Sequence, residues 1–136
     1  MDSVRGHVLL ALGLASLALV APSAQTTIVT GDHSTPLRPV AGAGNVGISN
    51  AVMRDQPEVR AVRVVVEPGG TRAMHAHTDV KFHLFVPITA AMTLNLDGEP
   101  SVVVPAWQPY FMKAGTRHGF HNTSASSVEI MEVFIR

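Results

Sequence analysis

Beyond about residue 50, the chain is a series of short apolar runs separated by turn residues, with no convincing helical periodicity. The runs are rich in β-branched residues, and several alternate apolar with polar positions, as strands with one buried face do. The pattern predicts an all-β domain, either a sandwich or a small barrel. Its expected strands are Val59–Glu67, Arg72–His77, Val80–Val86, Ala91–Leu96, Val102–Val104, Pro109–Met112, Arg117–Asn122 and Ser127–Ile135.

Turn residues separate these expected strands. Pro68-Gly69-Gly70 closes the first of them, and Asp97-Gly98 is a strong hairpin signal. The strand expected at Val80–Val86 is unusual because apolar residues lie on both of its faces. A strand buried on both faces needs cover from outside the barrel, which the N-terminal segment or a second subunit would supply. The pattern therefore makes a homodimer a candidate assembly.

The N-terminal residues have a different composition. Arg5 is followed by the uncharged apolar run Val8–Val20, which ends in small residues and is short for a membrane span. Residues 1–24 are therefore predicted to be a secretory signal peptide, with an uncleaved N-terminal anchor as the alternative. Either reading places the domain outside the cytoplasm, in the periplasm or the extracellular space. Residues 25–50, rich in Gly, Thr, Pro and Ser, are expected to be a lead-in segment, and residues 51–136 a single barrel domain.

Composition limits the partners of this domain. Of 136 residues, 46% are hydrophobic and only 15% are charged, which favours a compact domain with a core over disorder. Ten basic residues balance ten acidic ones without any basic cluster. We therefore expect no nucleic-acid partner, and no membrane contact beyond the signal segment. The absence of cysteine excludes disulfides, thiolate metal ligands, iron–sulfur clusters and a cysteine nucleophile.

Five of the seven histidines fall in two clusters, His75 and His77 with His83 six residues on, and then His118 and His121. Histidines at positions i and i+2 of a strand point to the same face. A third histidine from a neighbouring strand would complete three ligands and leave coordination positions open, as in catalytic metal sites. Neutral imidazole suits zinc, copper, iron and nickel. The clusters therefore predict a metal site that is open to a small molecule.

Two segments resemble the sequence motifs of the cupin superfamily. In its first motif a glycine precedes His-x-His, which corresponds here to Gly69-Gly70 and His75-Ala76-His77. In its second motif a glycine, a histidine and an asparagine follow at fixed spacing, which corresponds to Gly115, His118 and Asn122. The motifs stand in the family's order, and the resemblance extends from about residue 59 to residue 135. It implies a double-stranded β-helix, the jelly-roll barrel of the cupins.

The resemblance also implies a ligand set, and the sequence departs from it at one ligand. His75, His77 and His118 correspond to the three histidine ligands of a divalent transition metal, which would be Fe, Mn, Zn, Ni or Cu. The family's glutamate ligand falls at Lys81, and an ammonium at 4 Å from a cation is repelled by about 4 kcal/mol per unit charge pair at an intermediate dielectric. Lys81 would therefore turn away, pair with an acid such as Asp79, meet an anionic substrate, or mark a metal-free site.

His83 lies two residues beyond Lys81 and should share its inward face. It would serve as a substitute fourth ligand or as an acid or base near the metal, and the alternative is a core histidine bonded to a backbone carbonyl. Two further departures affect the second motif, where Trp107 replaces the opening glycine and Lys113 replaces the proline.

These observations leave two classes of function open. The first is an exported, metal-binding cupin enzyme of dioxygenase or isomerase type that acts on a small organic acid or diketone, with His83 and Lys81 as its catalytic candidates. The second is a non-enzymatic cupin module that binds a small molecule or a metal, which the lost carboxylate and Lys81 favour. A degenerate structural cupin without a working site is a third reading. The sequence alone does not decide whether the protein is an enzyme.

Overall fold

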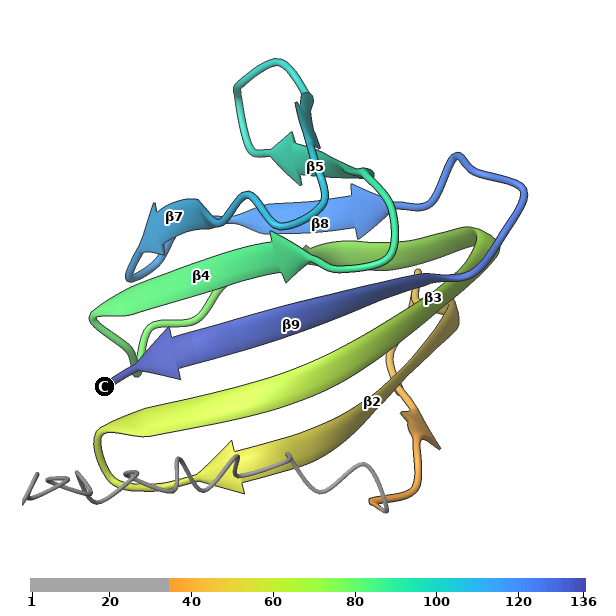
Figure 1. The fold of residues 1–136 in the computed structure, drawn as a ribbon. Helices are drawn as coiled ribbons and strands as arrows, with labels where there is room; N and C mark the ends of the chain where they lie inside the picture. Colours follow the sequence, from red (N-terminus) through yellow and green to blue (C-terminus); the bar gives the residue numbers. More distant parts are fainter. Residues whose placement is uncertain (1–34) are drawn as a thin grey trace, which may run out of the picture.

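The computed structural model describes residues 35–136, which form β-strands and no helix (Figure 1). The predicted signal peptide and the first part of the predicted lead-in lie outside these residues. Within the described part of the chain, there is no helix long and apolar enough to cross a membrane. The strands are β1 (Arg38–Pro39), β2 (Val46–Asp55), β3 (Val59–His75), β4 (Phe82–Pro87), β5 (Met92–Leu96), β6 (Val102–Val104), β7 (Tyr110–Lys113), β8 (His118–His121) and β9 (Val128–Ile135).

The strands form one continuous antiparallel sheet that folds over into two layers. One layer has the order β2–β3–β9–β4–β7, and the other has the order β3–β8–β5–β6 (Figure 1). Strand β3 belongs to both layers, which makes the sheet a nearly closed barrel with a shared interior. The predicted all-β jelly roll is confirmed.

Strand β3 bends from one layer into the other at the point where the sequence predicts a turn. Residues 59–66 of β3 pair with β9, and Thr71, Arg72 and His75 pair with β8. The predicted break at Pro68-Gly69-Gly70 was wrong, because these residues form a corner inside a single strand of 17 residues. Gly70 is required at the corner, since a Cβ atom there would lie 2.7 Å from the carbonyl oxygen of Gly47. Corners of this kind let one strand serve two packed sheets.

Strand β2 begins earlier than the sequence predicts. It starts at Val46, inside the expected lead-in of residues 25–50, and crosses the expected start of the barrel at residue 51. It pairs with β3 along its length, so that Ile48, Asn50 and Val52 lie opposite Val66, Val64 and Val62. The strand was missed because only Ile48 and Ala51 of its ten residues are buried, and these two are three positions apart, so the sequence shows no regular alternation. The segment is therefore part of the barrel wall.

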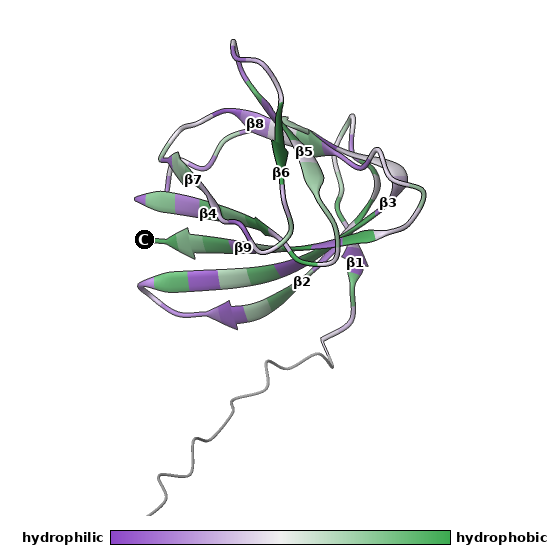
Figure 2. Cartoon of the chain, turned by 45° about the horizontal axis from the view of Figure 1, so that its top comes forward, coloured by the Kyte–Doolittle hydropathy of each residue, from purple (hydrophilic) through white to green (hydrophobic). Residues whose placement is uncertain are grey.

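The barrel interior is apolar except near one end. Inward and outward side chains alternate along the strands, which gives them a banded hydropathy (Figure 2). The buried core consists of Ile48, Val62, Val64, Val66, Val80, Phe85, Met92, Leu94, Val104, Met112, Phe120, Val128, Ile130 and Phe134. On β9 the inward positions are Val128, Ile130, Glu132 and Phe134. A carboxylate therefore stands in an otherwise apolar row.

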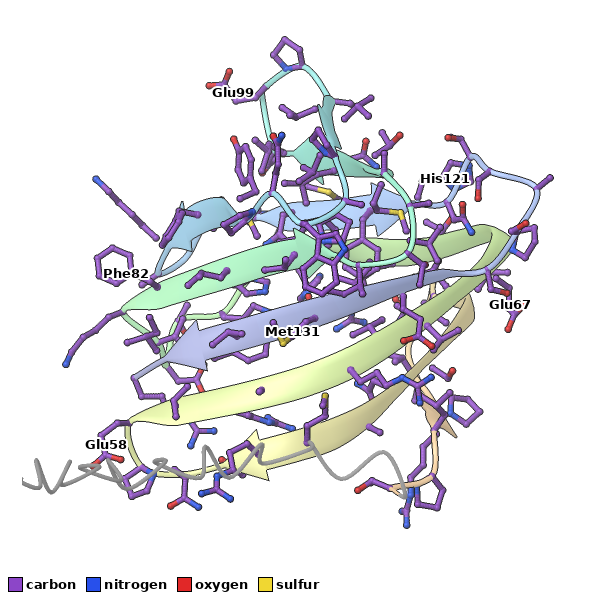
Figure 3. All side chains as sticks on the ribbon, in the orientation of Figure 1. Glu58, Glu67, Phe82, Glu99, His121 and Met131 are labelled. Carbon is purple, nitrogen blue, oxygen red and sulfur yellow. The ribbon has the colours of Figure 1, made fainter. Side chains whose placement is uncertain are left out.

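The outer face of the layer that contains β4 is also apolar. Leu84 lies opposite Val133 on β9 and opposite Phe111 on β7, and Phe82 lies opposite Ile135. Phe111, Phe82 and Ile135 are exposed, and Phe82 projects from the start of β4 (Figure 3). The structure thus bears out the sequence pattern in which this strand has apolar groups on both faces.

Candidate metal centre

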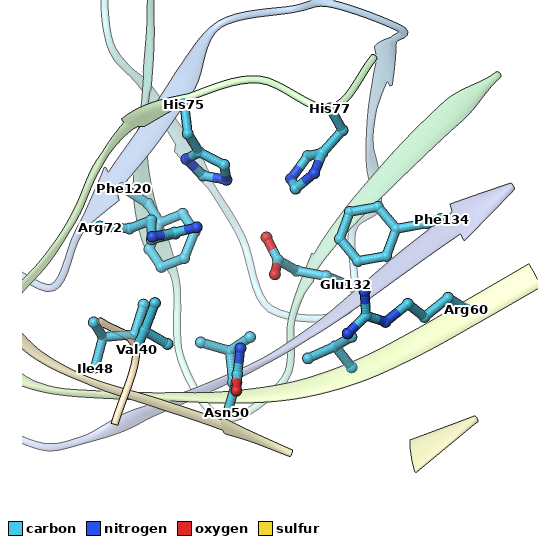
Figure 4. Close-up of a pocket in the computed structure, with 12 residues that line it drawn as sticks. Val40, Ile48, Asn50, Arg60, Arg72, His75, His77, Phe120, Glu132 and Phe134 are labelled. Atoms are coloured by element: carbon cyan, nitrogen blue, oxygen red, sulfur yellow. The ribbon is translucent and has the colours of Figure 1, made fainter. Parts of the chain in front are cut away.

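Three predicted ligands converge at one end of the barrel. His75 ends β3, His77 follows it, and His118 begins β8 directly opposite His75. One ring nitrogen from each lies within 4.8 Å of the others. Figure 4 shows the His75 and His77 rings pointing into the same cavity. The structure therefore brings together the three histidines that the sequence singled out.

A β-bulge produces this convergence. Arg72 pairs with Phe120 and His75 pairs with His118, so three residue steps on β3 match two on β8. The extra residue changes the alternation, and both Arg72 and His75 face the interior. Gly119 lies between the two pairs, and a Cβ atom there would lie only 2.6 Å from the Arg72 carbonyl oxygen. The glycine allows the close strand approach that sets the two histidines side by side.

Backbone carbonyls orient two of the rings. His75 Nδ1 donates to the Ala73 carbonyl oxygen and His118 Nδ1 donates to that of Thr116, each at 2.9 Å. Because a carbonyl oxygen only accepts, Nδ1 carries the proton in both rings and Nε2 keeps its lone pair. The Nε2 atoms of His77 and His118 are buried without a hydrogen-bond partner. Such orphaned acceptors are costly unless a ligand satisfies them, and carbonyl-bonded Nδ1 atoms are typical of metal-binding histidines.

His83 is the fourth histidine at this place. It is 1% exposed, and the centroid of its ring lies 5.0 Å from that of His77 and 4.9 Å from that of His118. Its ring stacks on Phe134, and neither of its nitrogens has a hydrogen-bond partner. The alternative of a core histidine bonded to a backbone carbonyl is therefore not what the structure has.

Glu132 completes the cluster and was not singled out from the sequence. Its Oε1 lies 3.4 Å from Nε2 of His83, in a geometry that leaves both atoms without a hydrogen bond. Glu132, His83 and His118 also offer ligand atoms within 4.8 Å of one another. The signal was present in the sequence, because a glutamate occupies an inward position between Ile130 and Phe134. The carboxylate that the first motif lacks is thus supplied by another strand.

Lys81 is the predicted site residue that the structure leaves outside the cluster. It precedes β4, and its side chain is exposed. Its backbone N–H donates to the Ile135 carbonyl oxygen, which fixes the main chain at the barrel rim. Among residues 35–136, neither Asp79 nor any other acidic residue forms an ion pair with Lys81. Of the alternatives that the sequence left open, the structure has the one in which Lys81 turns away.

Burial and neighbouring charges shift the pKa values of the histidines and of Glu132 in the cluster. Desolvation lowers the pKa of His77 and of His118 to about 4, despite the Thr116 carbonyl that favours the charged form of His118. Desolvation also lowers the pKa of His75, assisted by the positive charge of Arg72. For Glu132 burial raises the pKa, but the contact with His83 and the charges of the histidines outweigh it, so its pKa is lowered. Neutral imidazoles and an ionised carboxylate are the forms that bind metals.

These shifts predict how the stability of the metal-free protein depends on pH. The folded-state pKa values of about 4 for His77 and His118 lie below the ordinary value of 6.5. The unfolded chain therefore binds more protons between pH 6.5 and 4, and the free energy of unfolding should fall as the pH decreases through this window. We expect a loss of about 1–2 kcal/mol per pH unit from the two groups together. Urea unfolding of chelator-treated protein at pH 7, 6 and 5 measures it, and His118→Gln should reduce the slope. A stability that stays level or rises on acidification would contradict it.

The cluster opens into a cavity of about 170 Å³. Its walls come from β1–β2 and from β3, β8 and β9 (Figure 4). They consist of Val40, Ile48, Asn50, Arg60, Val62, Val64, Arg72, His75, His77, Phe120, Glu132 and Phe134. A small molecule in this cavity would contact His75, His77 and Glu132 directly.

The fold is shared with solved cupin structures. The polyketide cyclase RemF from Streptomyces resistomycificus superposes with a TM-score of 0.65 and 20% identity, over 75% of this chain and 74% of that chain. An RmlC-like cupin from Shewanella frigidimarina gives a TM-score of 0.62 and 18% identity, over 76% and 86%. A predicted oxalate decarboxylase from Thermotoga maritima gives 0.66 and 19%, over 75% and 93%. No family model matches the sequence, and no curated protein is similar to it in sequence.

The class of protein follows from these comparisons and from the histidine cluster. The chain has the cupin fold, as the two motifs predicted. The fold and its buried, partnerless imidazole nitrogens suit a divalent metal. Identities of about 20% establish the fold, while the activities named for the neighbours are those of the neighbours.

Proposed function

We propose that the protein is a metal-dependent cupin enzyme that acts on a small molecule in the cavity beside the histidine cluster. One observation carries this proposal. Four imidazoles and one carboxylate converge in the barrel, and three of their buried nitrogens have no hydrogen-bond partner: His77 Nε2, His83 Nδ1 and His118 Nε2. His83 Nε2 and Glu132 Oε1 have only each other, at 3.4 Å. A purely structural cluster would leave these desolvated groups uncompensated.

The side chains suit two separate tasks. His75, His77 and His118 would hold the metal, with His83 as a fourth ligand. A bound divalent metal supplies Lewis acidity or dioxygen activation, as in other enzymes with open metal sites. Glu132 is ionised and faces the cavity, so it can accept a proton from a substrate carbon or oxygen and return it, and His83 lies 3.4 Å from its Oε1. Proton movement by Glu132 favours isomerase-type chemistry, and a dioxygenase is the other reaction class.

Metal analysis and activity screening test this proposal together. Protein purified without added metal is expected to contain about one transition-metal ion per chain, which a chelator removes and one of Fe, Mn, Zn, Ni or Cu restores. Metal-loaded protein is then screened against small carboxylates and diketones for dioxygen uptake and for exchange of carbon-bound hydrogen with solvent deuterium. A stoichiometric metal without any turnover would favour the non-enzymatic binding module. A folded protein that takes up no metal would contradict the metal-dependent enzyme and would favour a module that binds a small molecule without metal.

We also propose an assembly and a location for the protein. The exposed apolar face formed by Phe111, Leu84 and Phe82 supports a homodimer through this layer. Phe111→Glu should then convert the dimer to a monomer in light scattering, whereas Val103→Glu, at an equally exposed position on β6, should not.

The uncharged run Val8–Val20 supports export to the periplasm or beyond, and the N-terminal sequence of the mature protein tests it.

A further inference from the structure

We infer that the cavity beside the histidine cluster binds a small carboxylate through Arg72, with Arg60 as a second cation, so that the substrate is an organic acid and not a diketone. The inference rests on the proposed function, because it names the substrate class of the same site. It concerns two arginines that neither cupin motif includes.

Arg72 faces the cavity because of the bulge in β3. It lies opposite the inward-facing Phe120, three residues before His75. In Figure 4 its guanidinium group points into the cavity below the His75 ring. The side chain is only partly exposed, and among residues 35–136 no acidic group forms an ion pair with it. A half-buried guanidinium without a counter-charge is available to bind an anion.

Arg60 reaches the same cavity from the other side. It lies opposite Phe134 on β9, two residues before Val62, which lies opposite Glu132. Its Nε is buried and has no hydrogen-bond partner. The contact of Arg60 with Asp55 is long, at 3.8 Å, and Asp55 accepts a closer hydrogen bond from Arg136 at 2.9 Å. Arg60 is therefore incompletely neutralised, but its side chain is 40% exposed and Asp55 lies nearby, so it should contribute less than Arg72.

The charges of the cavity favour an anion. Two guanidinium groups line it against one carboxylate, that of Glu132, and a bound divalent cation would add to the positive side. A guanidinium group matches the planar carboxylate with two parallel hydrogen bonds. The amide of Asn50 adds a neutral polar group, while Val40 and Ile48 form apolar wall. A neutral diketone would leave Arg72 without a counter-charge and Arg60 with only its long contact to Asp55.

The size of the cavity restricts the acid. A volume of about 170 Å³ corresponds to roughly six waters at about 30 Å³ each. The cavity therefore suits a small acid. With one carboxylate at Arg72, the remaining atoms of such a molecule would lie between Glu132 and the His75 and His77 rings.

Calorimetry with charged and neutral ligands of equal size tests the inference. Protein loaded with Zn²⁺ is titrated at low ionic strength with acetate, pyruvate and malonate, and with the matched amides acetamide, pyruvamide and malonamide. At least one acid is expected to bind about tenfold or more tightly than its amide. Inorganic phosphate is titrated in parallel, because a guanidinium group also pairs with phosphate, and a carboxylate site should bind it more weakly than that acid.

Three variants test which arginine causes the preference for the acid over the amide. Arg72→Gln should weaken binding of the acid by about tenfold or more and remove the preference over the amide, while Arg60→Gln should have a smaller effect in the same direction. Arg54→Gln is the matched control, since Arg54 is exposed on β2 and does not line the cavity. Thermal unfolding checks that each variant is folded.

The failure of this inference differs from the failure of the proposed function. Zn²⁺ stoichiometry is measured for every variant, and Arg72→Gln should still bind one ion per chain. If the wild type binds no Zn²⁺, the metal proposal fails, and the titrations of acid against amide are then made on the metal-free protein. Equal binding of acids and amides, no binding of any acid, phosphate binding as tight as the best acid, or an Arg72→Gln variant that binds like the wild type would each overturn the carboxylate site.

Discussion

Replacement of His118 by alanine is expected to lower the affinity for a divalent metal by roughly 10²–10³-fold, which corresponds to about one quarter of a typical four-ligand binding free energy. His118 is the ligand that both candidate groups share, since it lies with His75 and His77 and also with His83 and Glu132. Its loss therefore weakens the site whichever group holds the ion. Metal content after dialysis, and competition against a chelator of known affinity, measure the effect.

The metal-free fold should survive this change. His118 Nε2 is buried without a partner, so its removal relieves an unsatisfied group and partly offsets the cavity that the alanine leaves. His121→Ala is the matched control, because His121 lies on the same strand but forms a hydrogen bond with Thr71 Oγ1, outside the cluster. A His118→Ala protein that retains its metal, or a His121→Ala protein that loses it, would remove His118 from the ligand set.

The sequence predicts those parts of the fold that depend on local alternation. Strands β4 to β9 lie within a few residues of the expected runs, because turn residues bound each short apolar run and, in β5 and β9, a repeat of two places one face inside. The corner of β3 could not be predicted in the same way. Pro68-Gly69-Gly70 has the composition of a turn, and only pairing with β9 on one side of it and β8 on the other keeps the strand continuous. Those pairings join residues 43 to 76 positions apart.

In the candidate site, too, the residues with a local sequence pattern were predicted, and the one that depends on strand register was not. His75, His77 and His118 were found because a motif fixes their spacing. Glu132 was not, because its relation to the histidines depends on the register of β9 against β4, which sets Phe85 opposite Glu132 and His83 opposite Phe134. Strand alternation correctly turned His83 inward.

Alternation failed for Lys81, because it lies before the first residue of β4, where the strand pattern no longer holds. Its exposed side chain stands clear of the cluster, and Glu132 on β9 offers the carboxylate instead.

Trp107 has a backbone conformation that usually favours glycine. The cupin pattern has a glycine at this place. Trp107, with a φ of 63°, is the one non-glycine residue of the described chain in the left-handed region. A side chain there costs of order 1 kcal/mol relative to glycine. The indole ring is 71% exposed, so burial does little to offset the strain. Trp107 therefore has a backbone conformation that favours glycine, at the position where the second motif has one.

Asn122 holds the corner of β3 to the end of β8. Its Nδ2 donates to the carbonyl oxygens of Val66, Glu67 and Ser126 at 2.8–3.1 Å, and its Oδ1 accepts from the backbone N–H and the hydroxyl of Ser124. Its backbone N–H donates to the Gly70 carbonyl oxygen. The side chain is 1% exposed, so these carbonyls have little access to water. One residue thus satisfies the backbone where β3 changes partner, which gives a physical reason for the asparagine of the second motif.

Asn122→Ala is therefore expected to destabilise the metal-free protein by about 3–5 kcal/mol, because it removes the donor to the Val66 and Glu67 carbonyl oxygens and the acceptor of the Ser124 backbone N–H. For about 100 ordered residues this corresponds to a fall in Tm of roughly 15 °C or more. Ser124→Ala, which removes a single hydroxyl from the same network, should cost only about 1 kcal/mol. Asn122→Asp keeps the acceptor but sets a carboxylate against three carbonyl oxygens, so it should destabilise at least as much as alanine. Urea unfolding of the chelator-treated variants measures all three. If Asn122→Ala unfolds at the same urea concentration as Ser124→Ala, the corner is held by the strand pairings alone and the asparagine is not its support.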